Sequence, residues 1–184
     1  LILSAKHGKG KLIHAKILAS FLFTFSYIAA SSIISMGINV LLLGIEGWNL
    51  PVQLWNTIIP YRLAAFEACG INLLLMFLIA FLLTAISLLF SALCKSQMIV
   101  LAVDILLFFG AVFLPSSKTS SLWNHILCLF PIHSFNLKNV LEAYISYPFG
   151  DMVVSQLEMI VVVYGLIIMA CVFYTGKCFK NHQI

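Results

Sequence analysis

Four long apolar runs, separated by polar and charged segments, dominate the chain. They extend over residues 17–44, 70–93, 98–114 and 157–176. A transmembrane helix needs about 20 apolar residues to cross roughly 30 Å of hydrocarbon. The third run is shorter than this and contains one acidic residue, Asp104. The pattern predicts an all-α polytopic membrane protein with four transmembrane helices, in which residues 1–184 form a single domain.

The two connections at residues 45–69 and 115–156 are longer than tight turns require. They contain all five prolines and all three tryptophans of the chain. Proline interrupts helices, and aromatic rings with a polar edge favour the headgroup level of a membrane. We therefore expect short helices that lie at the outer interface, with plain loops as the alternative.

The composition excludes a water-soluble domain. Only 9% of the residues are charged and 62% are hydrophobic, whereas a soluble domain has roughly 25% charged residues. The net charge of +4 comes from a few lysines, so no nucleic-acid partner is expected. The chain begins with leucine, which suggests a fragment, and its first apolar run is too long for a signal peptide.

Basic residues are distributed unequally between the two sides of the predicted membrane domain. One side has seven lysines: Lys6, Lys9, Lys11, Lys16, Lys95, Lys177 and Lys180. The other side has only Arg62, Lys118 and Lys138. Because cytoplasmic segments are enriched in lysine and arginine, we expect a multi-pass protein of the cell membrane with both termini of this chain in the cytoplasm.

Histidines and cysteines show no arrangement typical of chemistry. The sequence lacks H-E-x-x-H and G-x-S-x-G, and no two carboxylates lie within one helical turn in any apolar run. We therefore expect no catalytic, cofactor-binding or metal-binding residues. Cys69 and Cys128 both lie on the outer side, so a disulfide between them is conceivable, although unpaired cysteines are the favoured interpretation.

Three polar residues inside the apolar runs are candidates for function. A carboxylate such as that of Asp104 costs on the order of 2.5–3.5 kcal/mol near the bilayer centre. It would serve as a polar contact in a substrate path or between helices, or else as a hydrogen-bonded structural acid. Ser31 and Ser35 lie one turn apart, which predicts close packing against a neighbouring helix, with a substrate-lining role as the alternative.

The segment SAKHGKGKL, residues 4–12, combines three lysines and two glycines directly before the first run. A phosphate-binding loop requires G-x-x-x-x-G-K-[ST]. With Gly10 and Lys11 as the G-K pair, Ala5 replaces the first glycine and Leu12 replaces the hydroxyl residue. The chain therefore has no ATP-binding loop of its own here.

The remaining interpretations of this segment are a lipid anchor and a contact for a partner subunit. An anchor needs only charge, at about 1 kcal/mol for each lysine near an anionic leaflet. Gly8 and Gly10 would permit a turn or a left-handed backbone, which an anchor does not require. Leu12, Ala15 and Lys16 lie at helical spacing. We therefore predict a short helix that lies along the cytoplasmic surface and docks into a groove of a partner.

Residues 3–20, LSAKHGKGKLIHAKILAS, resemble the cytoplasmic segment of type-2 permeases of ATP-binding-cassette transporters. In that family a basic, glycine-containing stretch ends in A-K and leads into a long transmembrane helix. Positions that match are Gly8, Lys11, Ala15 and Lys16, whereas Lys9 stands where arginine is common. The short turn FSALCKSQ, residues 90–97, and the basic tail are similar as well. Family permeases usually have six spans, so this chain would correspond to spans three to six.

The resemblance implies the membrane subunit of an ATP-driven exporter, which forms the translocation path with a second permease subunit. A separate nucleotide-binding ATPase subunit would use the ATP, and its motion would reach the membrane through residues 1–16. Implied coupling residues are Gly8, Lys9, Lys11, Ala15 and Lys16. The alternative is a small accessory or immunity-type membrane protein that binds a peptide or partner without transport. Neither the residues nor the resemblance names the substrate.

Overall fold

Three long helices form the body of the protein. The computed structural model describes residues 8–54, 56–57, 59–94, 96–115, 121–143, 145–149 and 152–181. The long helices are α1 (Gly8–Leu43), α2 (Ala65–Leu93) and α7 (Gln156–Asn181). Each contains a segment long and apolar enough to cross a membrane, and the segments coincide with the first, second and fourth predicted runs. The prediction of a helical membrane protein is confirmed for these three helices.

The third predicted run is shorter in the structure than a full span. The helix α3 (Gln97–Phe109) has 13 residues and continues into the 3-10 turn η2 (Gly110–Phe113). At 1.5 Å per residue α3 rises about 20 Å, less than the roughly 30 Å hydrocarbon core. Regular α-helical bonding ends at Gly110, and Pro115 follows shortly after, which limits further extension.

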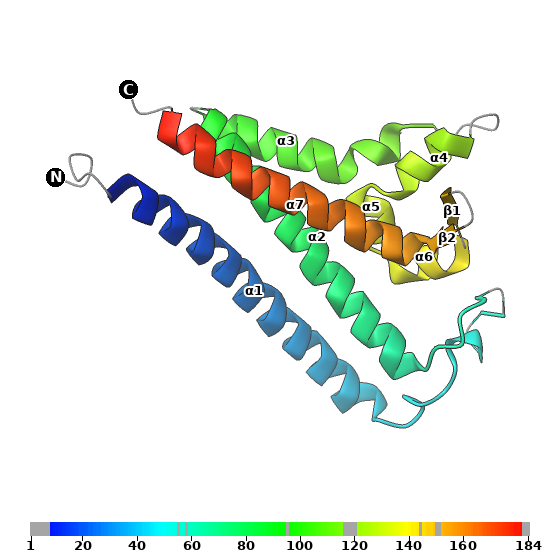
Figure 1. Cartoon of the computed structure of the whole chain (residues 1–184). Coiled ribbons are helices and arrows are strands. Elements are labelled where there is room, and N and C mark those ends of the chain that lie inside the picture. Colours follow the sequence, from blue (N-terminus) through cyan, green and yellow to red (C-terminus); the bar gives the residue numbers. More distant parts are fainter. Residues whose placement is uncertain are drawn as a thin grey trace.

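The helix α1 runs opposite to α2 and α7, which share one direction (Figure 1). The start of α1, the end of α7 and the connection between α2 and α3 lie at one end of the molecule. The connection from α1 to α2 and the short elements between α3 and α7 lie at the other end. The helix α2 is central, because α1, α3 and α7 all pack against it.

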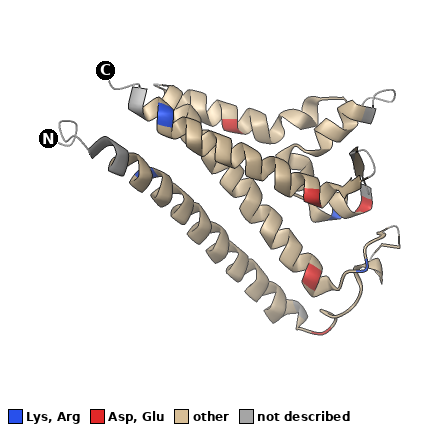
Figure 2. Ribbon diagram, viewed as in Figure 1, with Lys and Arg blue, Asp and Glu red and all other residues tan. Residues whose placement is uncertain are grey.

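Charged side chains follow the same division (Figure 2). Lys16 and Lys177 lie at the end where α1 begins and α7 ends. The opposite end has Arg62, Lys138 and all four described glutamates, namely Glu46, Glu67, Glu142 and Glu158. Asp104 lies within α3. For convenience we call these the basic end and the acidic end.

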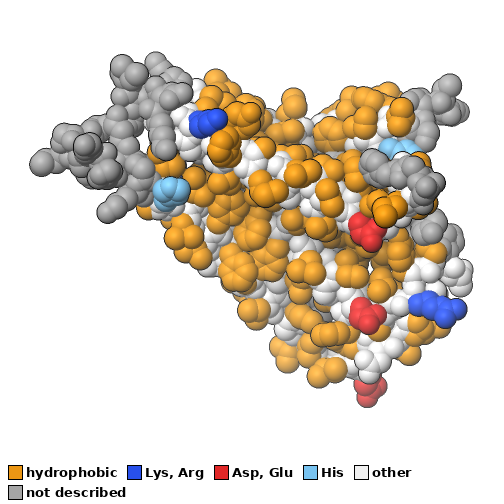
Figure 3. All heavy atoms as spheres, viewed as in Figure 1, with side chains coloured by type: hydrophobic (Ala, Val, Ile, Leu, Met, Phe, Trp, Pro, Cys, Tyr) orange, Lys and Arg blue, Asp and Glu red, His pale blue; other side chains and the backbone are white. Residues whose placement is uncertain are grey.

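The buried core joins α2 to α7 and to the short helix α6 (Leu137–Ala143). Its most deeply buried side chains include Leu75, Ile160 and Tyr164. The helix α1 contributes little, since Ile13 is the only buried one among its described side chains. Apolar side chains cover the face shown in Figure 3. Such a surface suits contact with lipid or with another membrane helix rather than with water.

The first connection leaves α1 through two glycines with left-handed backbones. Gly44 has φ +76° and Gly47 has φ +95°, values that L side chains rarely adopt. A short 3-10 turn, η1 (Val52–Leu54), follows. The helix α2 begins five residues before the predicted Gly70, because the Glu67 carboxylate accepts a hydrogen bond from the Ala64 N–H at 2.9 Å and satisfies that free donor.

In its described residues, the second connection contains three short helices and an antiparallel pair of strands. The helices are α4 (Ser121–Cys128), α5 (Pro131–Ser134) and α6, and the strands are β1 (Ser146–Phe149) and β2 (Met152–Ser155). Short helices broken by proline were predicted here, and their location at a membrane interface stays a prediction. The antiparallel pair of strands was not predicted, because each strand has only four residues and Pro148 interrupts the first.

Side chains of α7 hold this connection against the bundle. The Tyr164 hydroxyl donates to the Leu129 carbonyl at 2.8 Å, and the Gln156 amide donates to the Cys128 carbonyl at 3.2 Å. Both carbonyls lie where the backbone leaves α4 and has no helical partner to accept from. These bonds satisfy backbone acceptors that would otherwise stay unpaired beside the core.

Candidate functional site

The basic segment before the first span is part of α1. Gly8 and Gly10 belong to the first turn of one continuous right-handed helix that ends at Leu43. The predicted turn or left-handed backbone at these glycines is therefore wrong, and so is a short helix separate from the span. No proline or other helix-breaking feature lies between Gly10 and Lys16, so the helix has no reason to end. The side chains of Lys9 and Lys11 lie outside the described residues.

At the basic end, α1 contacts the end of α7. The Lys16 ammonium lies 4.9 Å from the centroid of the Phe179 ring, and the Lys177 ammonium lies 4.5 Å from that of Phe173. Such cation–π contacts contribute about 0.5–1 kcal/mol at exposed sites. Ala15 is exposed beside them. Of the implied coupling residues with described side chains, Ala15 is thus accessible to a partner, and Lys16 joins α1 to α7.

Asp104 connects α3 to α2. Its Oδ2 accepts a hydrogen bond from the Ser87 hydroxyl at 2.6 Å. Its Oδ1 is buried and has no hydrogen-bond partner among the described residues. A buried polar atom left unpaired costs about 1–3 kcal/mol, so the structure keeps this acid at an energetic cost. The contact lies between helices, which fits both the predicted polar contact between helices and the alternative of a hydrogen-bonded structural acid, so the choice between them stays a prediction.

A row of hydroxyl groups lies between α1 and α2, beside the hydrogen bond that joins Ser87 to Asp104. The Thr24 and Thr84 hydroxyls are 2.9 Å apart. A groove of about 570 Å³ follows the row toward the basic end, and its polar lining consists of Lys16, Ser20, Thr24, Thr84, Ser87 and Ser91. We call this the inner groove. These hydroxyls were not predicted as a site from the sequence, although the spacing of Ser20 and Thr24 places both on one helix face.

Ser31 and Ser35 lie in the other half of α1, toward the acidic end. Both are exposed, and they line a groove of about 450 Å³ between α1 and α2 together with Asn39 and Asn72. The Ser31 hydroxyl donates to the Ile28 carbonyl of its own helix at 3.0 Å. The predicted close packing of these serines against a neighbouring helix is therefore not seen within this chain. Their alternative role as substrate-lining residues stays a prediction.

A cavity of about 640 Å³ lies at the acidic end, between α2, α6 and the first connection. Its lining is mainly apolar and includes Glu142 and Lys138 of α6. Neither residue was singled out from the sequence, because a lysine and a glutamate one turn apart are typical of an ordinary exposed helix face.

Other reactive side chains are dispersed. No three His, Cys, Asp or Glu residues in the described part of the chain lie close enough together to hold a metal ion. Each of the five cysteines is free, so Cys69 and Cys128 do not form the conceivable disulfide. Burial raises the pKa of the Cys128 thiol, which keeps it protonated and poorly reactive.

No protein-family model, no curated protein and no solved structure matches the chain.

Proposed function

We propose that the chain is a membrane-spanning subunit of an ATP-driven exporter, and that it works with a separate nucleotide-binding ATPase subunit and a second permease subunit. The observation that carries the proposal is the basic end. Lys16 and Lys177 lie together there with the start of α1, whose sequence resembles the coupling segment of type-2 permeases. The excess of lysines on the side of the basic end, seven against three basic residues on the other side, supports the cytoplasmic location of the basic end.

A fourth crossing by α3 and η2 completes this topology. Together they contain 17 residues, as the apolar segment Gln97–Phe113. Thirteen α-helical residues and four 3-10 residues rise about 28 Å, which is close to the roughly 30 Å hydrocarbon thickness. Four crossings leave both ends of the chain on the cytoplasmic side, next to the proposed ATPase.

The length of α1 supports its use as a lever. Its 36 residues extend about 54 Å, whereas a bilayer with its headgroups is about 40–45 Å thick. One continuous helix therefore reaches from the membrane into the cytoplasm, where a partner subunit can push on it. Since Ile13 is its only buried described side chain, α1 is held loosely enough to tilt against α2 and α7.

The inner groove is the proposed inner part of the translocation path. Polar groups inside membrane proteins usually face the bundle interior or a water-filled space. Thr24 and Thr84 close the groove through their hydrogen bond, and Ser87 connects it to Asp104. A tilt of α1 would break the Thr24–Thr84 contact and extend the groove toward Ser31 and Ser35.

Purification of the chain from its native membranes tests the proposal. A tag on this subunit should recover an ATPase subunit in a fixed ratio, and the complex should hydrolyse ATP in a manner that orthovanadate inhibits. A chain recovered intact without ATP hydrolysis would contradict the proposal and favour an accessory membrane protein. Digitonin and a mild maltoside detergent should be compared, so that the absence of the ATPase is not caused by one detergent.

A further inference from the structure

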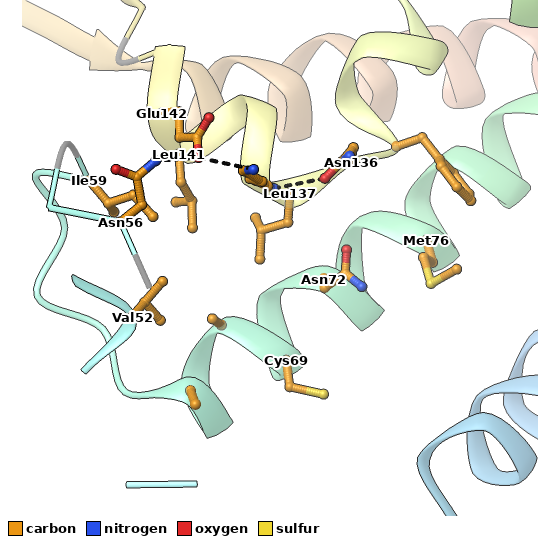
Figure 4. A pocket seen from close by; sticks show the side chains of 14 residues that line it. Val52, Asn56, Ile59, Cys69, Asn72, Met76, Asn136, Leu137, Leu141 and Glu142 are labelled. Atoms are coloured by element: carbon orange, nitrogen blue, oxygen red, sulfur yellow. Dashed lines mark hydrogen bonds and ion pairs between the residues drawn. The ribbon is translucent and has the colours of Figure 1, made fainter. Parts of the chain in front are cut away.

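The cavity at the acidic end has the size and lining of a ligand site (Figure 4). Its volume of about 640 Å³ lies within the roughly 300–1,000 Å³ typical of small-molecule sites. Apolar side chains form most of the lining, and they include Val52, Ile59, Phe135, Leu137 and Leu141. Four of these five are buried, so packed apolar side chains form the wall of the cavity.

One carboxylate lies among these apolar groups. The Asn56 amide donates to Glu142 Oε1 at 2.6 Å and fixes the orientation of the carboxylate (Figure 4). The Lys138 ammonium is 3.7 Å from the same oxygen. The Glu142 side chain is 27% exposed and that of Lys138 is 68% exposed, so the lysine occupies the rim of the cavity. Exposed ion pairs of this kind contribute only about 0–1 kcal/mol, so a cation in the cavity can displace the lysine.

The surroundings also favour a cation. Among the described residues, the acidic end has four glutamates against Arg62 and Lys138. An excess of one charge around a cleft raises the local concentration of ions of the opposite sign. The amides of Asn72 and Asn136 line the cavity and add neutral hydrogen-bonding groups without a second positive charge.

We propose that this cavity binds a cationic amphiphile, with the apolar body against Leu137 and Leu141 and the positive group on Glu142. The ligand class is an organic cation of roughly drug size. Within the proposed function, this ligand would be the exported compound, bound at the outer side of the membrane where it is released. Only this last assignment rests on the proposed function. Binding itself requires neither ATP nor a partner subunit.

Equilibrium binding to the purified chain, without ATP or ATPase, tests the site. The probes are tetraphenylphosphonium and tetraphenylborate, which have nearly the same size and shape and opposite charge. The wild-type chain should bind the phosphonium cation at least about tenfold more tightly than the borate anion, because the cavity has a carboxylate and only a rim lysine. Equal affinity for both probes, or no binding of the cation, would overturn the proposal, and this comparison requires no variant to fold.

Charge-removing variants identify the residue. Glu142→Gln should weaken cation binding by about tenfold or more, whereas Lys138→Gln should leave it unchanged or tighten it. Glu46→Gln is the matched control, because it removes the same charge from the same end outside the cavity. Unchanged affinity in Glu142→Gln would overturn the assignment. An equal loss of affinity in Lys138→Gln would overturn it as well, because that result is expected for a zwitterionic ligand. Binding is measured on the chain alone. An absence of binding can therefore be told apart from a failure of the ATPase to co-purify.

Discussion

Replacement of Ala15 by proline is expected to reduce ATP hydrolysis by the assembled complex by a factor of about ten or more. Ala15 lies in the interior of α1 at the basic end, just before the apolar run predicted at residues 17–44. Proline there removes one backbone hydrogen bond and clashes with the preceding turn, at a cost of about 3 kcal/mol or more. The helix would kink in the turn before Ala15, ahead of the contact between Lys16 and Phe179, and a push by the ATPase on the first residues of α1 would no longer reach α2 and α7.

The matched control is Ala15→Leu at the same position. Leucine is larger than proline but keeps the helix, so it tests whether the effect comes from altered surface contact. Ala15 is exposed, and leucine should therefore fit without displacing core residues. We expect near wild-type hydrolysis for Ala15→Leu. Full activity in Ala15→Pro, in a complex recovered in normal yield, would show that α1 does not act as a continuous lever.

Substitution of Asp104 is expected to separate stability from activity. In Asp104→Leu the buried, unpaired Oδ1 disappears, which should stabilise the chain by about 1–3 kcal/mol. Ser87 keeps an acceptor, because its hydroxyl also lies 2.8 Å from the Leu83 carbonyl. Activity should nevertheless fall, since the polar group beside the inner groove is lost. Asp104→Asn should retain most activity, because its amide oxygen can accept the same hydrogen bond from Ser87.

Thermal unfolding in detergent and ATP hydrolysis by the complex measure the two effects. A gain of 1 kcal/mol raises the midpoint by about 2–4 °C in a chain of this size. Lower activity with higher stability is the usual mark of a residue kept for function. A chain with Asp104→Leu that is both less stable and less active would instead identify Asp104 as a structural acid. Unchanged activity and stability would make it incidental.

The length and polarity of the apolar runs were enough to predict the three long helices. Individual residues near the helix ends determine where these helices begin. Residues 8–16 extend the first helix because no proline interrupts them, and Glu67 allows the second helix to begin earlier than the apolar run. The pair of strands could not be predicted, since two strands of four residues, one with a proline, give too short a pattern.

The contacts of the candidate sites could not be predicted, because they join residues far apart in the chain. Thr24 and Thr84 are 60 positions apart, and Asn56 and Glu142 are 86 apart. Helical spacing shows which side chains share a face, but it does not show which helix that face meets. Asp104 was recognised because a charge in an apolar run is conspicuous, whereas Glu142 lies in a polar connection where glutamate is ordinary.

Movement of α1 against α7 during ATP hydrolysis is the central claim, and cross-linking of the two helices tests it most directly. The Lys16 ammonium and the Phe179 ring, 4.9 Å from it, mark where the helices meet at the basic end. Cysteines would replace Lys16 and Phe179 in a chain without its native cysteines, and a reducible bismaleimide would join them. Single-cysteine chains treated with the same reagent are the controls. We predict that the locked complex loses ATP hydrolysis and recovers it when the linker is reduced. Undiminished hydrolysis with complete cross-linking would contradict the account.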